Sequence, residues 1–299
     1  YDKLILSPGA EPIKPNLPGS DDDRVFTLRT VPDTLKIRAY VEQNKPKSAA
    51  VIGGGYIGME MAENLKHAGL DVTVVEMAEH IIAPLDSDMA SLVQHYAREN
   101  GIRLILKNGV QALTPTESHI EVQLNHGSLN ADLVLMSVGV KPETAIAQKA
   151  GISCNSRGAI LVDEHMRTSI PDIYAVGDAI AVTNFVTKQE AYIPLAGPAN
   201  KQGRIAADHI CGRNASFKGT QGTSVLKLFD MTVATTGIHE LQAKQCNLDY
   251  DTIITYSPSH ATYYPNAKNM MIKTIFEKQS GKILGAQLVG YEGVDKRCN

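Results

Sequence analysis

The stretch Gly53-Gly54-Gly55-Tyr56-Ile57-Gly58 decides the fold of this 299-residue chain, because it has the spacing GxGxxG directly after an apolar run, residues 49–52. In such a loop the first glycine permits a tight turn and the second lets a pyrophosphate approach the backbone. The third lets a helix pack closely on the strand. Unpaired N–H groups at the start of that helix attract the phosphates. The spacing predicts a dinucleotide site at Gly53, Gly55 and Gly58, with Tyr56 and Ile57 beside the cofactor.

The next residues complete a strand–helix–strand unit, in which Gly69 ends the helix and residues 72–75 form the second strand. The buried face of the helix is expected at helical spacing, at Ile57, Met61, Leu65 and Ala68. Glu76 ends the second strand, 18 residues after Gly58 and close to the ~20 typical of an acid that binds the adenosine ribose. Its carboxylate accepts hydrogen bonds from ribose hydroxyls and repels a 2′-phosphate. The sequence therefore favours NADH over NADPH.

The pattern around this unit indicates two more kinds of structure. Strands and helices alternate up to residue 155, which is typical of a parallel, doubly wound sheet. From about residue 222 onward strands dominate and predict a separate antiparallel domain. Helices are expected at 31–43, 88–100 and 197–211. Strands are expected at 102–106, 120–124, 133–136, 159–162, 173–176, 225–229, 251–256, 270–276 and 283–289.

Composition argues against several classes of partner. The net charge is −3 and the pI is near 6.3, so there is no electrostatic case for nucleic acid or an anionic membrane. No apolar run approaches the ~20 residues of a membrane span. The four cysteines have neither CxxC nor zinc spacing, so we expect no metal site and reduced thiols in a cytoplasmic protein.

A second nucleotide signature lies at residues 168–178, Thr-Ser-Ile-Pro-Asp-Ile-Tyr-Ala-Val-Gly-Asp. It resembles the second flavin motif of the pyridine nucleotide-disulfide oxidoreductases, in which the last aspartate, here Asp178, contacts the ribityl and phosphate region of FAD. The alternative is an aspartate that only caps the next helix.

Three more segments resemble the same family. Residues 1–10, with Gly9, match the exit from the flavin domain, and residues 138–142, with Gly139, match the end of the nicotinamide domain. Residues 194–204 match a helix start beside the flavin ring, at Leu195 and Ala196. A helix N-terminus there stabilises the negative charge of reduced flavin.

The resemblance covers nearly the whole chain and implies its architecture. A doubly wound Rossmann-type NAD-binding domain (44–155) is inserted in a partial FAD-binding domain (1–43 and 156–220), and an α+β dimerisation domain follows (221–299). The family's reaction passes a hydride from NADH to FAD and then electrons to a disulfide-type substrate. Glu60 matches the residue that holds the nicotinamide amide, and a solvated helix glutamate is the alternative.

The last part of the chain is similar to one branch of the family, the coenzyme A-disulfide and coenzyme A-persulfide reductases. This similarity rests on residues 260–267, His-Ala-Thr-Tyr-Tyr-Pro-Asn-Ala, and on residues 281–287 and 293–297. It implies that Tyr264 assists catalysis at the redox cysteine of a dimer partner. It also implies that His260 lies near the flavin and that Asn200 contacts coenzyme A. Packed or surface residues are the alternative for all three.

The family's first flavin-phosphate loop and redox cysteine have no match here, and the chain begins as if within a domain. We therefore expect an N-terminally truncated fragment that is inactive alone and holds FAD weakly. The expected partner is a second copy of the chain, and the substrate is coenzyme A disulfide or persulfide. Two alternatives remain open: an NADH oxidase or peroxidase acting on oxygen or peroxide, and an NADH-binding, dimerising module without activity.

Overall fold

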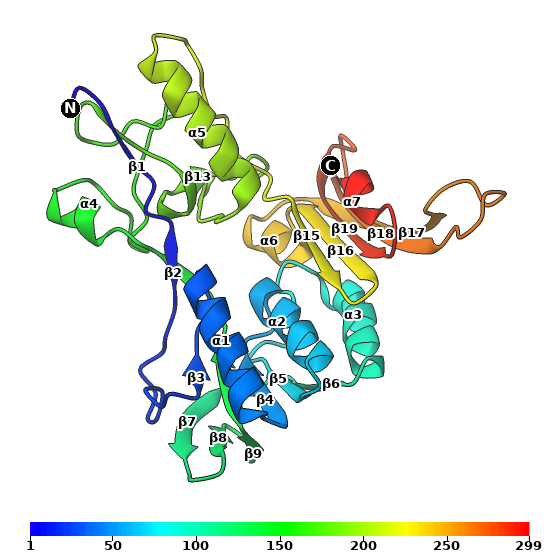
Figure 1. Ribbon diagram of the computed structural model, residues 1–299. Helices are drawn as coiled ribbons and strands as arrows, with labels where there is room; N and C mark the ends of the chain where they lie inside the picture. The colour runs from blue at the N-terminus through cyan, green and yellow to red at the C-terminus, as the bar shows by residue number, and fades with distance from the viewer. Residues whose placement is uncertain (299) are drawn as a thin grey trace.

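The computed structural model describes residues 1–298, and Asn299, the last residue of the expected third domain, lies outside the described residues (Figure 1). Its centre is a five-stranded, all-parallel sheet in the order β3-β10-β4-β5-β6. The strands are β3 (Val25–Phe26), β10 (Leu133–Met136), β4 (Ser48–Ile52), β5 (Asp71–Val75) and β6 (Ile102–Ile105). The expected parallel sheet is confirmed.

The two faces of this sheet are covered differently. Helices α1 (Val31–Asn44), α2 (Tyr56–His67) and α3 (Ser87–Glu99) share one apolar core with it. A second core on the other face is closed by a three-stranded antiparallel sheet of β7 (Val110–Pro115), β8 (Ile120–Leu124) and β9 (Ser128–Ala131). Because parallel strands are apolar on both faces, this small sheet takes the place of a second helical layer.

The buried face of α2 agrees only in part with the one expected from its apolar spacing. Leu65 is buried as expected, whereas Ile57 is 38% exposed and Ala68 is exposed. The reason is the close approach of Gly58 to the loop before the helix, which turns the face that contains Gly58 toward the sheet. Ala62 and Leu65, four and seven positions after Gly58, lie on the same face and are buried.

The remaining part of the first 220 residues holds short strands and one long helix. Strand β1 (Leu4–Leu6) pairs with β12 (Ile173–Ala175), and β2 (Ala10–Pro12) pairs with β11 (Val140–Pro142). Strand β13 (Val182–Thr183) pairs with β14 (Glu190–Ala191), and the helices are α4 (Ala145–Lys149), the 3-10 turn η1 (Gly177–Ala179) and α5 (Ala196–Ile210). The strand expected at 159–162 is wrong: Ile160 makes only isolated bridges, and Ala159 and Ile160 are buried in an irregular loop in which Leu161 is exposed.

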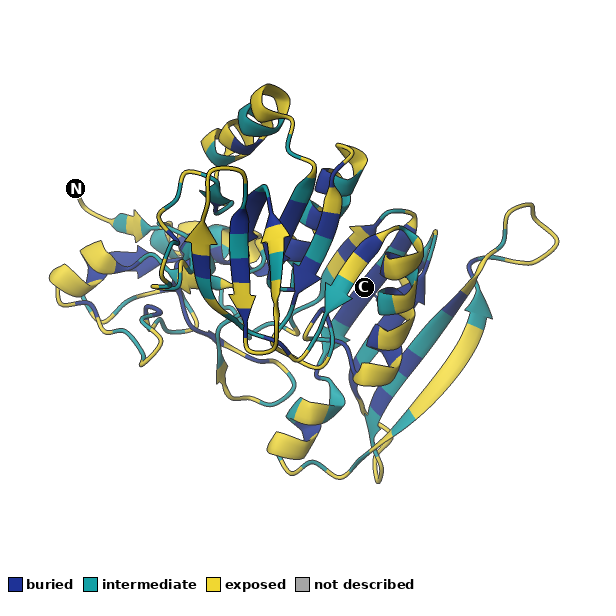
Figure 2. Cartoon of the chain, turned by 90° about the horizontal axis from the view of Figure 1, so that it is seen from below, coloured by how far each residue is buried: buried dark blue, intermediate teal, exposed yellow. Residues whose placement is uncertain are grey.

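The C-terminal part is a five-stranded antiparallel sheet in the order β15-β16-β19-β18-β17, as expected, with β16 added to the expected strands. Its strands are β15 (Ser224–Leu228), β16 (Met231–Gly237), β17 (Tyr250–Pro258), β18 (Asn269–Glu277) and β19 (Ile283–Gly290), and its helices are α6 (Glu240–Gln245) and α7 (Val294–Cys298). The edge strand β17 is exposed along much of its length (Figure 2). Residues of β15 and β16 share the core of α2 and α3, so this sheet packs directly on the nucleotide-binding part.

The contacts bear on where the inserted domain begins. Strand β3 extends the parallel sheet beside β10, and Ile37 of α1 lies in that sheet's core. We therefore propose that the insertion starts near Val25, before the position suggested by the sequence. Among residues 1–298 no helix combines the length and the apolar character needed to cross a membrane.

Candidate functional site

The glycine loop has the geometry that its spacing predicts. Gly53 follows β4 with φ +106°, a conformation that L side chains rarely adopt. A Cβ atom at Gly58 would overlap the carbonyl oxygen of Gly53 and lie 2.7 Å from Ser137 Oγ. At Gly55 a Cβ atom would meet nothing within 4 Å. Two of the glycines are thus needed for packing, and Gly55 leaves open space at the helix N-terminus.

Glu76 is brought to this loop from the end of β5. Its Oε2 accepts a hydrogen bond from the Gly54 amide at 2.6 Å, and its Oε1 accepts one from the Ala78 amide at 2.8 Å. The carboxylate is half-buried and retains lone pairs for further donors. The structure thus places Glu76 beside the glycine loop, and its binding of ribose hydroxyls stays a prediction.

The other residues expected at the nicotinamide site differ in their surroundings. The Tyr56 hydroxyl lies 2.6 Å from Ser224 Oγ of β15, so it joins α2 to the C-terminal sheet. Glu60 is exposed on α2, and partial desolvation followed by the charge of Glu63 raises its pKa. Gly139 follows Ser137, which packs against Gly53, and is therefore near the loop.

A second turn, Gly177-Asp178, lies at the start of α5. Gly177 has φ +79°, and its amide donates to Oε1 of the buried Gln202 at 2.8 Å. Helix α5 begins after Leu195 without a capping side chain and without an acid in its first turn. Its first N–H groups and partial positive charge are therefore available to an anionic group beside Asp178.

Arg29 and Tyr192 also lie beside this second turn, although no pattern in the sequence indicates either residue. Arg29 Nη1 lies 3.9 Å from Asp178 Oδ2, and its guanidinium lies against Gly9. The buried Tyr192 hydroxyl has no hydrogen-bond partner in the described part of the chain. Burial, followed by the charge of Asp178, raises the Tyr192 pKa to about 12. An unpaired buried hydroxyl beside a glycine turn and a free helix N-terminus fits a polar cofactor such as FAD.

The ribbon of β2 and β11 connects the two turns. The Ile13 amide donates to the Gly139 carbonyl, and the Glu143 amide donates to the Gly9 carbonyl, both at 3.0 Å. Gly9 and Gly139 therefore lie just before the two paired strands, at opposite ends of this short antiparallel ribbon. The ribbon links the segments of the two expected nucleotide sites through backbone hydrogen bonds.

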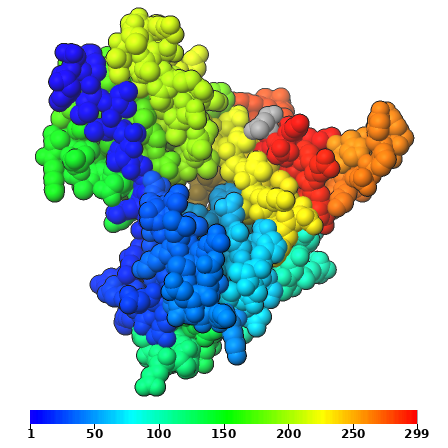
Figure 3. Space-filling view, in the orientation of Figure 1, coloured from blue at the N-terminus to red at the C-terminus, as the bar shows by residue number. Residues whose placement is uncertain are grey.

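Three expected residues lie elsewhere. Asn200 is exposed on α5. His260 and Tyr264 lie on the loop between β17 and β18, which projects from the side of the molecule away from α5 (Figure 3). His260 Nε2 lies 3.1 Å from the Pro265 carbonyl, and Tyr264 is 60% exposed, with its ring tilted by 38° against that of Tyr263. Within one chain, this loop is not placed at Asp178.

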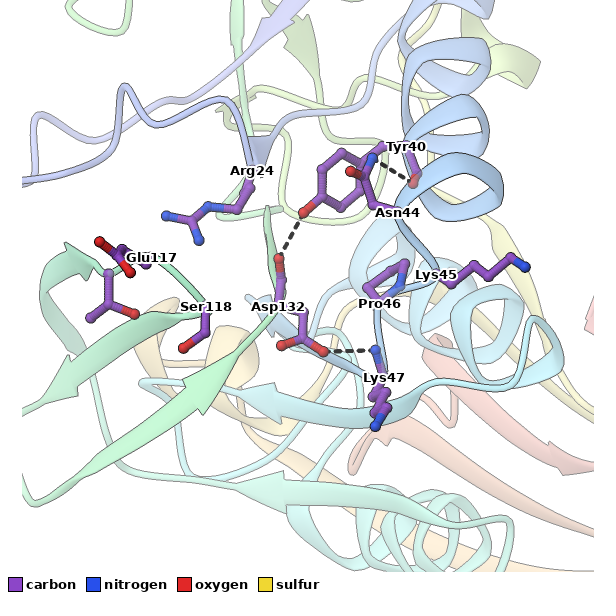
Figure 4. A pocket seen from close by; sticks show the side chains of 10 residues that line it. Arg24, Tyr40, Asn44, Lys45, Pro46, Lys47, Glu117, Ser118 and Asp132 are labelled. Atoms are coloured by element: carbon purple, nitrogen blue, oxygen red, sulfur yellow. Dashed lines mark hydrogen bonds between the residues drawn. The ribbon is translucent and has the colours of Figure 1, made fainter.

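Cys154, Cys298 and a cavity at the other end of the parallel sheet do not belong to either site. Burial raises the pKa of Cys154, and it raises that of Cys298 to about 11, the opposite of a reactive thiolate. A cavity of about 670 Å³ lies beside Lys47 and Asp132, at the amino ends of β4 and β10, opposite the glycine loop (Figure 4). In residues 1–298 no group of three or more His, Cys, Asp or Glu side chains is arranged so that it could hold a metal ion.

Comparison with known proteins places these two nucleotide turns in one family. Residues 1–203 match the pyridine nucleotide-disulphide oxidoreductase model, and residues 223–297 match the dimerisation domain of the same family. The chain belongs to the pyridine nucleotide-disulphide oxidoreductases.

Several relatives are similar along the whole chain. An NADH oxidase of Methanocaldococcus jannaschii is 39% identical over 100% of this chain and 66% of its own length. A coenzyme A disulfide reductase of Staphylococcus haemolyticus is 34% identical with the same coverage of both chains. The structure of reduced Bacillus anthracis CoADR-RHD is 49% identical with a TM-score of 0.96, over 100% of this chain and 54% of that one. The chain thus spans less than two thirds of these proteins.

Proposed function

We propose that this chain is the NADH-binding and flavin-contacting part of a reductase that acts on coenzyme A disulfide or persulfide. The observation that carries the proposal is the pair of turns, one at Gly53–Gly58 with Glu76 and one at Gly177–Asp178 with α5, joined by the β2 and β11 ribbon. Two adenine dinucleotides need two such frameworks. The Bacillus anthracis structure and the staphylococcal coenzyme A disulfide reductase support the choice of substrate.

The chain's own residues bind and orient the two cofactors. The α2 N-terminus at Gly55 receives the pyrophosphate of NADH, and Glu76 accepts hydrogen bonds from its ribose. Asp178, Tyr192 and the first turn of α5 would hold FAD, which supplies the link between a hydride donor and thiol–disulfide exchange when bound. The helix N-terminus favours the charge that accompanies flavin reduction.

Residues on the projecting loop support a further proposal about assembly. Tyr264 and His260 are exposed or bonded within their own loop, so we propose that they complete the site of a partner in a homodimer. The match to a dimerisation domain supports this. Tyr264 would donate a proton to a leaving thiolate, and Asn200 would contact coenzyme A. We also propose a cytoplasmic location, in keeping with four free cysteines.

Titrations of the chain with NADH, NADPH and FAD test the cofactor proposal. We expect NADH to bind at least about tenfold more tightly than NADPH, a difference of 1.4 kcal/mol. Glu76→Gln should narrow this ratio, whereas the matched control Glu79→Gln, whose exposed carboxylate pairs with Lys107, should not. Failure of NADH to bind at millimolar concentration would overturn the proposal.

A second function, NADH oxidase, is favoured by the 39% identity to the archaeal NADH oxidase. Assays of NADH oxidation by the full-length protein, with added FAD, separate the possibilities. Faster oxidation with coenzyme A disulfide than with air-saturated buffer supports the reductase, and the reverse supports the oxidase. NADH binding without oxidation by either acceptor indicates a binding module.

A further inference from the structure

We propose that Lys273, on the C-terminal sheet, is a positioning residue for the NADH loop. It would hold the segment 78–86 against Gly54 and thereby set the affinity for NADH. The inference rests on the proposed function, since it concerns the same dinucleotide site, but it also makes a claim about the free chain. That claim is tested separately below.

The Lys273 ammonium joins two parts of the molecule. Its side chain is 2% exposed, and Nζ lies 3.1 Å from Asp86 Oδ2, 2.7 Å from Asp88 Oδ2 and 2.5 Å from Glu240 Oε1. Asp86 and Asp88 start α3 in the nucleotide-binding part, whereas Glu240 starts α6 in the C-terminal part. A buried ammonium requires such partners, because an unpaired charge in the interior is very costly.

Asp86 is fixed by more than the ammonium. Its amide donates to Gln287 Oε1 at 2.7 Å, and Gln287 Nε2 donates back to Asp86 Oδ2 at 2.7 Å. The Glu240 amide donates to Asp86 Oδ1 at 3.0 Å. The residue before α3 is therefore bonded to β18, β19 and α6 at once, and all these partners belong to the C-terminal part.

The segment that ends at Asp86 also supports the glycine loop. The Ile82 amide donates to the Gly54 carbonyl at 2.8 Å, and a Cβ atom at Gly54 would lie 2.7 Å from Ile81 Cγ2. Ile81 and Ile82 are both fully buried. Ile82 has φ +56°, which is unusual for a β-branched residue and requires surroundings that hold it. A shift of Asp86 would therefore be transmitted to Gly54 through a short, packed segment.

Charge balance explains the expected effect of losing Lys273. Three carboxylates converge on one ammonium, so its removal leaves like charges facing one another at the junction. The repulsion acts between α3 and α6, and the segment 78–86 is the connection it would loosen. Among the described residues no hydrogen bond or ion pair links the turn at Gly177–Asp178 to Lys273 or its three carboxylates, so the FAD site should keep its affinity.

The test compares Lys273→Met with the matched control Lys278→Met, which follows β18 and pairs only with Asp249 of its own domain at 3.8 Å. In the Lys273 variant we expect the NADH dissociation constant to rise about fivefold, within the range for positions that do not touch the ligand. FAD affinity should stay unchanged, and hydrogen exchange at residues 78–86 should accelerate. Unchanged exchange there in a folded variant would overturn the proposal.

A second variant and a measurement that does not depend on NADH binding keep the test decisive. If Lys273→Met does not fold, Lys273→Gln removes the same positive charge but keeps a polar side chain among the three carboxylates, and it should also accelerate exchange at 78–86; no acceleration would overturn the proposal. If the parent chain does not bind NADH, the proposed function fails, whereas the exchange measurement still decides whether Lys273 holds this segment.

Discussion

Substituting Gly58 and Gly55 separately by alanine distinguishes the packing role of the glycine loop from its ligand role. At Gly58 the new Cβ atom would lie 2.7 Å from Ser137 Oγ and overlap the Gly53 carbonyl, where real Cβ atoms essentially never come within 3.0 Å. The carbonyl is backbone, so α2 must move by about 1 Å. Such overpacking costs about 3 kcal/mol. At Gly55 the Cβ atom meets nothing within 4 Å, so the cost is below about 1 kcal/mol.

The two variants should therefore separate in two measurements. Gly58→Ala should lower the thermal unfolding midpoint by about 6 °C, at 2 °C or more per kcal/mol. Gly55→Ala should leave the midpoint within about 2 °C of the parent, but it should weaken NADH binding at least tenfold, because its methyl group occupies the space left for the pyrophosphate. Each variant is the control for the other. Equal loss of stability in both, or full NADH affinity in Gly55→Ala, would refute the reasoning.

Three further outcomes follow from the site and the junction. Tyr192→Phe should weaken FAD binding about fivefold in a flavin fluorescence titration, without lowering the midpoint of the FAD-free chain, because its hydroxyl is unpaired there. Burial lowers the pKa of His239, so urea titrations should show full stability above about pH 6.5 and a loss as pH falls through the lowered pKa; His239→Gln should flatten that slope. The hydrogen bond from Lys273 lowers the pKa of Glu240, so a second loss should begin below about pH 4.5 and be absent from Glu240→Gln.

Sequence alone predicted the helices and strands that depend on interactions between residues close together in the chain. The glycine spacing and the apolar runs on either side of it determine a strand, a turn and a helix, and Glu76 reaches the loop because two parallel strands end at the same edge. The buried face of α2 could be predicted only in part in this way, because Leu65 is buried as its spacing indicates but Ile57 is exposed. Its orientation depends on the contact of Gly58 with Gly53 rather than on apolar spacing. The run at 159–162 shows the same limit, since burial without a partner strand does not make a strand.

The residues that sequence reasoning missed act over long separations. Lys273 and Asp88 are 185 positions apart, and neither stands in a pattern that marks an ion pair. Arg29 and Tyr192 meet at Asp178 only after β1 pairs with β12 and α5 packs on the Gly177 turn. Their roles emerge from topology, so a single sequence gives no signal for them.

The junction between the nucleotide-binding part and the C-terminal sheet combines two kinds of contact with different consequences. Leu226, Leu228 and Val233 share the core of α2 and α3. This apolar burial stabilises the junction, but hydrophobic contacts are not directional. The Lys273 cluster adds little net stability by comparison, since desolvation offsets most of the attraction in a buried ion cluster. Its atoms are satisfied in only one arrangement of α3, α6 and β18. We infer that the apolar core holds the two parts together, while the charges select the orientation in which segment 78–86 presses on Gly54.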